Sequence, residues 1–158
     1  MAQITVGISD MKFSTRAEDV IVTHSLGSCL GVTAYDKVLR IGAMVHCLLP
    51  LASASPDKAQ ANPHMFVSSS VPAMVKLLFK LGATKNNLIF KCAGGANMRG
   101  DTMFNTGSRN FEALDNLLKK NAIVLAGQEV GGSIPRTMSL HLDTGRVMVR
   151  TYGEEHEI

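Results

Sequence analysis

Residues 23–50 read THSLGSCLGVTAYDKVLRIGAMVHCLLP, and they predict two neighbouring strands. Residues 31–36 alternate Val and Ala with Thr and Tyr, which favours a strand. Residues 40–49 form a mostly apolar run that Pro50 ends, as expected of a buried strand. A turn at Asp36-Lys37 joins the two runs. We therefore expect a hairpin that brings Cys29, near the start of one strand, beside His46, near the end of the other.

Cys29 lies in Gly27-Ser28-Cys29-Leu30-Gly31, which matches the short Gly-x-Ser-x-Gly pattern of a nucleophile elbow with cysteine in the serine position. Small neighbours allow a tight turn and the approach of a substrate carbonyl. The segment that follows is rich in strand formers, so the pattern does not imply an α/β-hydrolase fold. An imidazole at hydrogen-bond distance would lower the pKa of the thiol from about 8.5 and create a thiolate nucleophile. A third group should orient the ring, and the nearby candidates are Thr23, Ser25 and Asp36.

The rest of the chain predicts further strands and two main helices. Strands are expected over residues 4–8, 20–22, 87–92, 122–126, 138–142 and 146–151, and helices over about 66–81, with Pro72 in the first turn, and 109–120. Residues 9–19 and 51–63 read as loops, and residues 153–158 as a frayed tail. The order of elements indicates an α+β fold: a single layered domain over residues 1–158 with mixed sheets.

Composition narrows the classes of protein. The chain has 158 residues, 46% hydrophobic and 18% charged, which is enough for one globular core. The absence of Trp and a modest net charge of +3 argue against a nucleic-acid partner. No apolar run approaches the roughly 18 residues that span a bilayer, and the first residues lack the features of a signal peptide. With only three cysteines, we expect a cytoplasmic protein with reduced thiols and no membrane insertion.

Each candidate residue has a simpler alternative. An apolar setting makes Cys92 and Cys47 core residues, and a single histidine on a strand is often structural. Zinc is a second alternative for His24, Cys29, His46 and Cys47, but the chain lacks a Cys-x-x-Cys or His-x-x-x-His spacing. In addition, neighbouring His46 and Cys47 should point to opposite faces of a strand. We therefore expect neither a metal nor a cofactor.

Residues 94–110 hold further polar candidates. Gly94-Gly95 with Asn97 suits either anion binding through backbone N–H groups or a plain turn. Arg109 and Asn110, at a helix start, either orient a loop or substrate or form an ordinary solvated cap. Met103 and Phe104 either anchor a polar loop to the core or form a patch for a protein partner.

Several linked motifs resemble the CheD family of bacterial chemotaxis proteins, which are chemoreceptor glutamine deamidases. They are Thr23-x-x-Leu26-Gly27-Ser28-Cys29, then Tyr35-Asp36, then Gly42-x-Met44-x-His46-x-x-Leu49-Pro50. The likeness continues through KCAGGANM at 91–98, GSRN at 107–110, the glycine pair at 131–132 and TGRV at 144–147. Cys47, Glu129 and Pro135 depart from the usual pattern of the family.

The resemblance implies a function and roles for residues. Cys29 would be the nucleophile, His46 its base and Thr23 the third member, with backbone groups at Gly27 and Ser28 binding the oxyanion. It implies a layered fold like the catalytic domain of a deamidating toxin, and glutamines of methyl-accepting chemotaxis receptors as substrates. It also implies a CheC-type phosphatase as partner. Asn97, Phe104, Arg109 and Asn110 are the residues we assign to the substrate or partner surface.

Three other functions stay open at the level of sequence. The same thiol and base would hydrolyse a glutamyl methyl ester of the receptor. A second possibility is an adaptor that mainly binds receptor and CheC, although an intact set of Cys29, His46 and Thr23 argues against binding alone. A third is a hydrolase of small amides, for which we expect free glutamine not to be a substrate.

Overall fold

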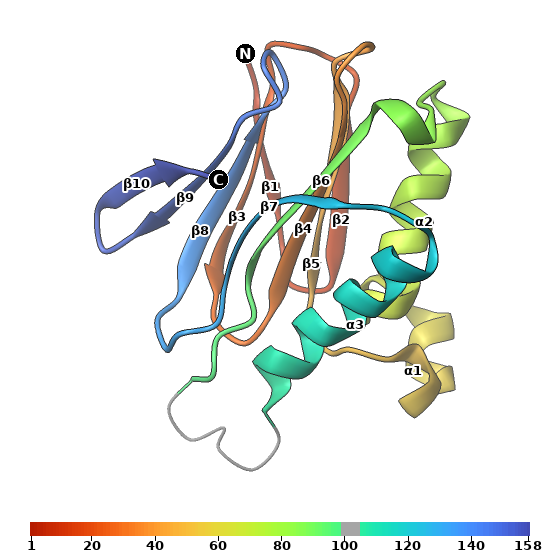
Figure 1. Ribbon diagram of the computed structural model, residues 1–158, viewed down its shortest axis with the longest axis vertical. Coiled ribbons are helices and arrows are strands. Elements are labelled where there is room, and N and C mark those ends of the chain that lie inside the picture. The colour runs from red at the N-terminus through yellow and green to blue at the C-terminus, as the bar shows by residue number, and fades with distance from the viewer. Residues whose placement is uncertain (99–104) are drawn as a thin grey trace.

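The computed structural model describes residues 1–98 and 105–158, in which ten strands form two five-stranded sheets (Figure 1). The first sheet has the order β1-β3-β8-β9-β10 and the second has the order β2-β5-β4-β6-β7. The pairs β1–β3 and β6–β7 are parallel and the others antiparallel, so both sheets are mixed. The strands are β1 Gln3–Val6, β2 Asp10–Ser14, β3 Val20–Leu26, β4 Leu30–Asp36, β5 Ile41–Cys47, β6 Leu88–Gly94, β7 Leu125–Val130, β8 Arg136–His141, β9 Val147–Thr151 and β10 Glu154–Glu157.

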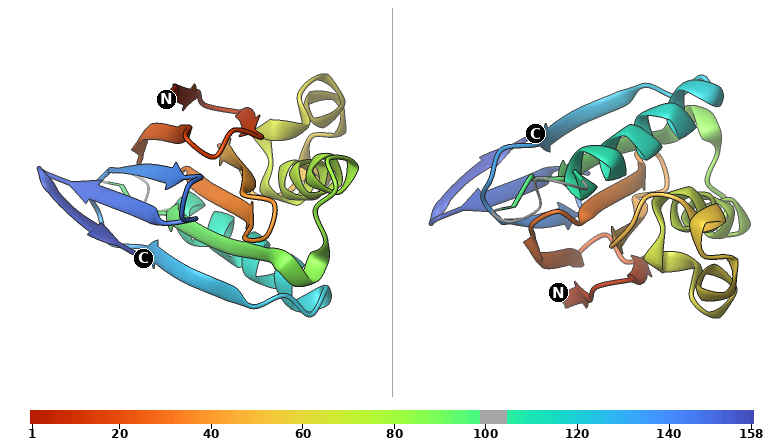
Figure 2. Two further views of the ribbon diagram at one scale, coloured as in Figure 1. Left: turned by 90° about the horizontal axis from the view of Figure 1, so that it is seen from above. Right: turned by 90° about the horizontal axis from the view of Figure 1, so that it is seen from below.

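Helices cover the outer side of the second sheet (Figure 2). The α-helices are α1 Pro56–Ala61, α2 Val67–Lys80 and α3 Thr106–Lys120, and three short 3₁₀ turns are η1 Ala52–Ala54, η2 Pro63–Met65 and η3 Lys85–Asn87. Both long helices are amphipathic and turn residues such as Met74 and Leu114 toward the sheet. The molecule therefore has three layers: a sheet, a second sheet and a layer of helices. This confirms the α+β class with mixed sheets and two main helices.

The second sheet lies between two apolar cores. One core joins it to the helices and includes Val45, Cys47 and Cys92. The other fills the space between the sheets and includes Cys29, Met44 and Met138. Because both faces are covered, all residues of β4 and β5 are buried. This explains why residues 40–49 read as a continuous apolar run instead of an alternating one.

The predicted hairpin is present as β4 and β5. These strands pair antiparallel, with Gly31 opposite His46 and Asp36 opposite Ile41. The Asp36 carboxylate accepts hydrogen bonds from the N–H groups of Val38 and Leu39, both at 2.9 Å, and so closes the turn. The Asp36 side chain therefore stabilises the turn, at the end of the hairpin opposite to His46.

Several expected boundaries are wrong because long-range contacts decide them. Residues 9–19 are not all loop, since β2 pairs with the edge of β5. Residues 51–63 contain η1 and α1 in place of a plain loop. The tail is ordered as β10, which pairs with β9. Pairing with a neighbouring strand satisfies backbone groups of polar segments that alone have little strand propensity.

Helix and strand ends also shift. Pro72 lies inside α2 and not in its first turn, because α2 begins at Val67, a fully buried residue. α3 begins at Thr106 and not Arg109. β7 spans Leu125–Val130 instead of residues 122–126, because Ala122 and Ile123 close the end of α3 through N–H bonds to Lys119 and Leu118.

Candidate active site

Thr23 is presented by an irregular part of β3. The register between β3 and β8 shifts between Thr23 and Leu26, so β3 carries one residue more than its partner there. Ser25 takes a left-handed backbone with φ of 59°. A bulge of this kind bends the strand and redirects side chains, and it often lies next to an active site. The Thr23 side chain points into the protein and is fully buried, whereas Ser25 is exposed.

The turn that carries Cys29 is held by the segment around the end of β6. The N–H groups of Gly95 and Ala96 donate to the carbonyl oxygens of Cys29 and Gly27, each at 2.9 Å. The close approach requires glycine at position 94, where φ is 107° and a Cβ would lie 2.3 Å from the Cys29 oxygen. Gly94 thus lets β6 fix the backbone of Cys29. The Cys29 thiol faces the core between the sheets and is 7% exposed.

His46 lies on the same face of the hairpin as Cys29. Its β4 partner is Gly31, two residues beyond Cys29, so the two side chains project toward the first sheet. Cys47 projects the other way into the core beneath the helices, as predicted from strand alternation. The hairpin therefore brings the sulfur and the imidazole to one end of the layer between the sheets.

The hydrogen bonds of Thr23 assign the tautomer of His46. The Thr23 hydroxyl donates its single proton to the carbonyl of Val6 at 2.8 Å. It lies 2.7 Å from Nδ1 of His46, and since its proton is already used, it must accept a proton from Nδ1. Nε2 is then the unprotonated nitrogen of the neutral ring. Among the described residues Nε2 has no hydrogen-bond partner, although it is buried.

Burial sets the charge of both groups. It lowers the pKa of His46 from 6.5 to about 4 and raises the pKa of Cys29 above its ordinary value. Both shifts favour the uncharged forms. No hydrogen bond joins the Cys29 thiol to Nε2 of His46 among the described residues. The thiolate expected for an imidazole at hydrogen-bond distance therefore stays a prediction, while burial favours a neutral thiol and a neutral ring.

The structure chooses between the three candidates for the orienting group. Ser25 is exposed and Asp36 closes the hairpin turn, whereas Thr23 hydrogen-bonds directly to the ring of His46. Sequence alone did not decide between them because β3 and β5 belong to different sheets.

The backbone groups near Cys29 differ in their availability. The N–H of Gly27 donates to the Ser25 carbonyl at 3.0 Å and is therefore occupied. Within the part of the chain that the structure describes, the N–H groups of Ser28 and Cys29 donate to no other residue. Ser28 and Cys29, not Gly27, are thus the donors available to a developing oxyanion.

The predicted surface residues divide into two groups. Asn97 and Arg109 are exposed, and the side-chain Oδ1 of Asn97 accepts a 3.3 Å hydrogen bond from the Ser108 hydroxyl. Phe104, like Met103, lies outside the described residues. Asn110 is fully buried, so its assignment to a surface is wrong. Its position on the second turn of α3 turns its amide inward, because α3 begins three residues earlier than expected.

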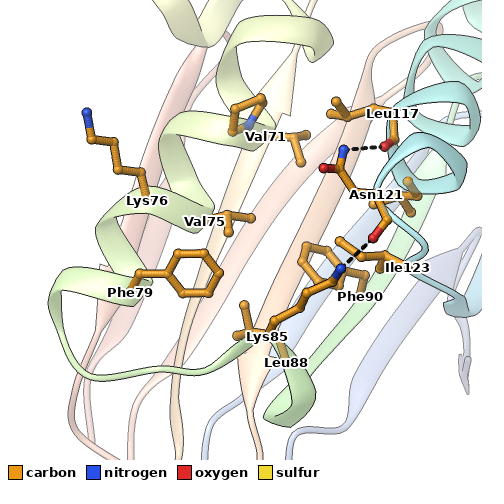
Figure 3. A pocket seen from close by; sticks show the side chains of 12 residues that line it. Val71, Val75, Lys76, Phe79, Lys85, Leu88, Phe90, Leu117, Asn121 and Ile123 are labelled. Carbon is orange, nitrogen blue, oxygen red and sulfur yellow. Dashed lines mark hydrogen bonds between the residues drawn. The ribbon is translucent and has the colours of Figure 1, made fainter.

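An apolar groove of about 280 Å³ lies away from these residues, between α2 and the end of α3 (Figure 3). Phe79, Leu88, Phe90 and Leu117 are among its lining residues. Lys85 crosses its edge and donates to the Asn121 carbonyl at 2.6 Å. None of the candidate catalytic residues lines this groove.

Two further observations concern the described residues only. No group of three or more His, Cys, Asp or Glu side chains in residues 1–98 and 105–158 is arranged to hold a metal ion. In the same part of the chain, no helix has the length and apolar character needed to cross a membrane.

The fold and the site define a class: an α+β protein in which a buried cysteine and a buried histidine lie on one face of a central hairpin, toward the layer between two sheets. Residues 48–151 match the family model described as CheD chemotactic sensory transduction. This chain belongs to the CheD family. Thr23, Cys29 and His46 lie before the part that this family model matches, but within the part aligned with a relative over the whole chain.

Three relatives show the extent of the similarity, and each is named "Probable chemoreceptor glutamine deamidase CheD", one with the number 1 added. The protein of Solibacter usitatus is 38% identical over 100% of this chain and 94% of its own length. That of Symbiobacterium thermophilum is 40% identical over 97% and 95%. That of Syntrophus aciditrophicus is 36% identical over 97% and 96%.

Proposed function

We propose that this protein hydrolyses glutamine side chains of chemoreceptors to glutamate, with Cys29 as nucleophile and His46 as base. Two kinds of observation support the proposal. Relatives that match nearly the whole chain carry the name of this activity. Independently, Thr23 holds His46 in the tautomer whose buried Nε2 is free to accept a proton, on the face of the hairpin that carries the Cys29 thiol.

The first half of the reaction releases ammonia. Nε2 of His46 takes the thiol proton while Sγ of Cys29 attacks the carbonyl carbon of the glutamine side chain. The C–S bond forms and the C=O π electrons move to oxygen, which the N–H groups of Ser28 and Cys29 stabilise. The imidazolium then returns its proton to the nitrogen, the C–N bond breaks, and ammonia leaves a thioester on Cys29.

The second half hydrolyses this thioester. Nε2 removes a proton from water as the water oxygen attacks the carbonyl carbon. The C–S bond breaks, the sulfur recovers a proton from the imidazolium, and glutamate is released. Thr23 keeps the ring in place throughout, but as a neutral acceptor it stabilises the imidazolium less than a carboxylate would.

The direct test measures the mass of a receptor cytoplasmic fragment after incubation with the protein. Wild type should add about one mass unit per modified glutamine, as exchange of NH₂ for OH requires, and should release ammonia. Cys29→Ala should be inactive yet folded. Cys92→Ala is the matched control because Cys92 is also buried but packs against the helices. Full activity in folded Cys29→Ala would overturn the assignment of the nucleophile.

The same assay distinguishes the alternatives. Loss of a methyl group from methylated receptor, with unmodified glutamines unchanged, would instead show a methylesterase. Binding without any change in mass would show an adaptor. A cytoplasmic location and a CheC-type phosphatase as partner belong to the proposal as well. Co-purification with receptor fragment and with CheC tests the second of these separately.

A further inference from the structure

Asn110 joins the two segments that carry the reacting groups. Its side-chain Nδ2 donates to the Ser28 carbonyl at 2.9 Å and to the Leu48 carbonyl at 3.2 Å. Ser28 immediately precedes Cys29, and Leu48 lies two residues after His46. One buried amide therefore links the turn of the thiol to the end of the strand that carries the base.

The orientation of this amide is fixed by its partners. Both carbonyl groups only accept hydrogen bonds, so the NH₂ end of Asn110 must face them. The other end, Oδ1, is buried and has no hydrogen-bond partner among the described residues. A buried acceptor without a partner destabilises the folded protein, because the hydrogen bond that it made to water in the unfolded chain is lost. Among the described residues the amide is therefore only half satisfied, and its hydrogen bonds are the two that it donates to Ser28 and Leu48.

The helix that carries Asn110 is anchored against the same turn. A Cβ at Gly107 would lie 2.2 Å from the Ala96 carbonyl oxygen, so glycine lets the first turn of α3 pack directly on the backbone of Gly95 and Ala96. Gly95 and Ala96 in turn donate to the carbonyls of Cys29 and Gly27. Figure 1 shows the start of α3 at the same end of the molecule as the turn between β3 and β4. Asn110 extends this rigid contact from the Cys29 turn to the end of β5.

We propose that Asn110 is a positioning residue that sets the distance and direction between the Cys29 thiol and Nε2 of His46. Its part in catalysis rests on the proposed function, whereas its effect on the thiol and the base does not. Without its two donors, the Ser28 carbonyl and the Leu48 carbonyl lose their common partner. The thiol and the base then move independently, and proton transfer between them becomes less frequent.

The test replaces Asn110 with Leu, which keeps a similar volume and removes both donors. Asn121→Leu is the matched control: Asn121 is at the end of the same helix and donates to the Leu117 carbonyl at 2.8 Å, far from the site. We expect kcat for deamidation to fall about 10- to 100-fold in Asn110→Leu with KM changed by less than about threefold, because displacement of reacting groups by about 1 Å affects the chemical step most. Asn121→Leu should change neither value by more than about twofold.

A second readout needs no receptor. The rate at which iodoacetamide alkylates Cys29 is measured at pH 7 in wild type, His46→Ala, Asn110→Leu and the double variant. If Asn110 acts through the pairing of thiol and base, His46→Ala should slow alkylation several-fold in wild type but have little further effect in Asn110→Leu. If the double variant slows alkylation by the product of the two single effects, the proposal is overturned and Asn110 has only a structural role.

The two readouts separate the two proposals. One outcome is that wild type is inactive on the receptor although His46→Ala still slows alkylation in wild type and not in Asn110→Leu. In that case the proposed function fails and the positioning role stands. If deamidation is robust and Asn110→Leu keeps its kcat, the positioning role fails alone. Should Asn110→Leu not fold, Asn110→Ala, which adds no bulk, undergoes the same measurements below its melting temperature.

Discussion

At the scale of single residues, the most informative feature is the protonation state of His46. A threonine hydroxyl has one proton, and the Thr23 hydroxyl donates it in a hydrogen bond to the Val6 carbonyl. The oxygen that remains can only accept, which commits Nδ1 of His46 to carry the ring proton. Thr23 thereby orients the imidazole ring, as the aspartate of a protease triad does. Unlike that aspartate, it carries no negative charge that would stabilise an imidazolium.

This arrangement predicts the effect of removing the threonine hydroxyl. In Thr23→Val the shape is kept but the acceptor for Nδ1–H is lost, so the ring proton is no longer held on Nδ1. We expect kcat for deamidation to fall about 10- to 100-fold, less than for loss of a triad aspartate. Thr23→Ser should restore most of the activity and Ser25→Ala should have no effect. An unchanged rate in folded Thr23→Val would exclude this role of the hydroxyl.

A second prediction concerns stability and pH. The pKa of His46 is lowered to about 4 in the folded protein by burial, against about 6.5 when unfolded. Between these values the unfolded chain binds more protons, so the stability from the neutral ring is complete above pH 6.5 and is lost as the pH falls toward 4. The loss should be on the order of 3 kcal/mol. Urea unfolding at pH 7 and at pH 4.5 measures it.

His64 is also partly buried, and burial lowers its pKa too, so it contributes to the same pH dependence. The variant His46→Asn is therefore the control, because it removes the contribution of His46 alone. The variant should lose less stability on acidification than wild type by about the stated amount. An identical pH dependence in both proteins would mean that His46 is protonated in the folded state at pH 4.5.

At the scale of elements, β6 and α3 decide the shape of the Cys29 turn. Neither is adjacent to Cys29 in sequence, yet Gly95, Ala96 and Asn110 bind its carbonyls or those of its neighbours. The bulge in β3 adds the third constraint by turning Thr23 inward. The site is therefore assembled from the ends of elements, where backbone groups that no ladder uses are available.

Gly94→Ala tests this packing. The new Cβ would lie 2.3 Å from the Cys29 carbonyl oxygen, at a backbone φ of 107°. We expect a loss of activity of at least about 10-fold and a lower melting temperature, because the Cys29 turn must move. Gly153→Ala separates the two causes, since Gly153 also has a positive φ of 86° but has nothing within 4 Å of its added Cβ. Equal effects of the two substitutions would attribute the result to backbone strain alone.

At the scale of the whole molecule, the three cysteines differ in the layer where they lie and in their burial. All are free thiols. Cys29 lies at the end of the layer between the sheets and is 7% exposed, whereas Cys47 and Cys92 are fully buried beneath the helices. Burial raises the pKa of Cys47 and of Cys92 to about 12, which further suppresses their reactivity.

Alkylation of the folded protein should therefore modify one thiol, at Cys29, and three after unfolding in urea. The slow labelling of Cys47 and Cys92 should follow global unfolding, because they lie on the central strands β5 and β6. Mass spectrometry of peptides after brief exposure to iodoacetamide measures both. Rapid labelling of Cys47 in the native state would show that α2 separates from the sheet without global unfolding.

The sequence predicted the parts of this fold that depend on local pattern. Residues 23–50 predicted the hairpin, and the apolar periodicity predicted both long helices. The same stretch supplied Cys29 and His46, because strand alternation and a turn between two strands suffice to place them on one face. The polar segments at residues 9–19 and 153–158 were misread, since their strands exist only by pairing with β5 and β9.

What the sequence by itself determined is thus the hairpin that places Cys29 and His46 on one face and the family to which the chain belongs. Only the tertiary structure decided that Thr23 and not Asp36 hydrogen-bonds to the ring of His46 and that Asn110 is buried between the two segments. It also decided that burial favours the uncharged forms of Cys29 and His46. The physical reason is that these properties depend on contacts between different sheets and layers and on exclusion of water. A linear pattern encodes which face a side chain takes, but burial and hydrogen-bond partners across layers arise only when the layers pack.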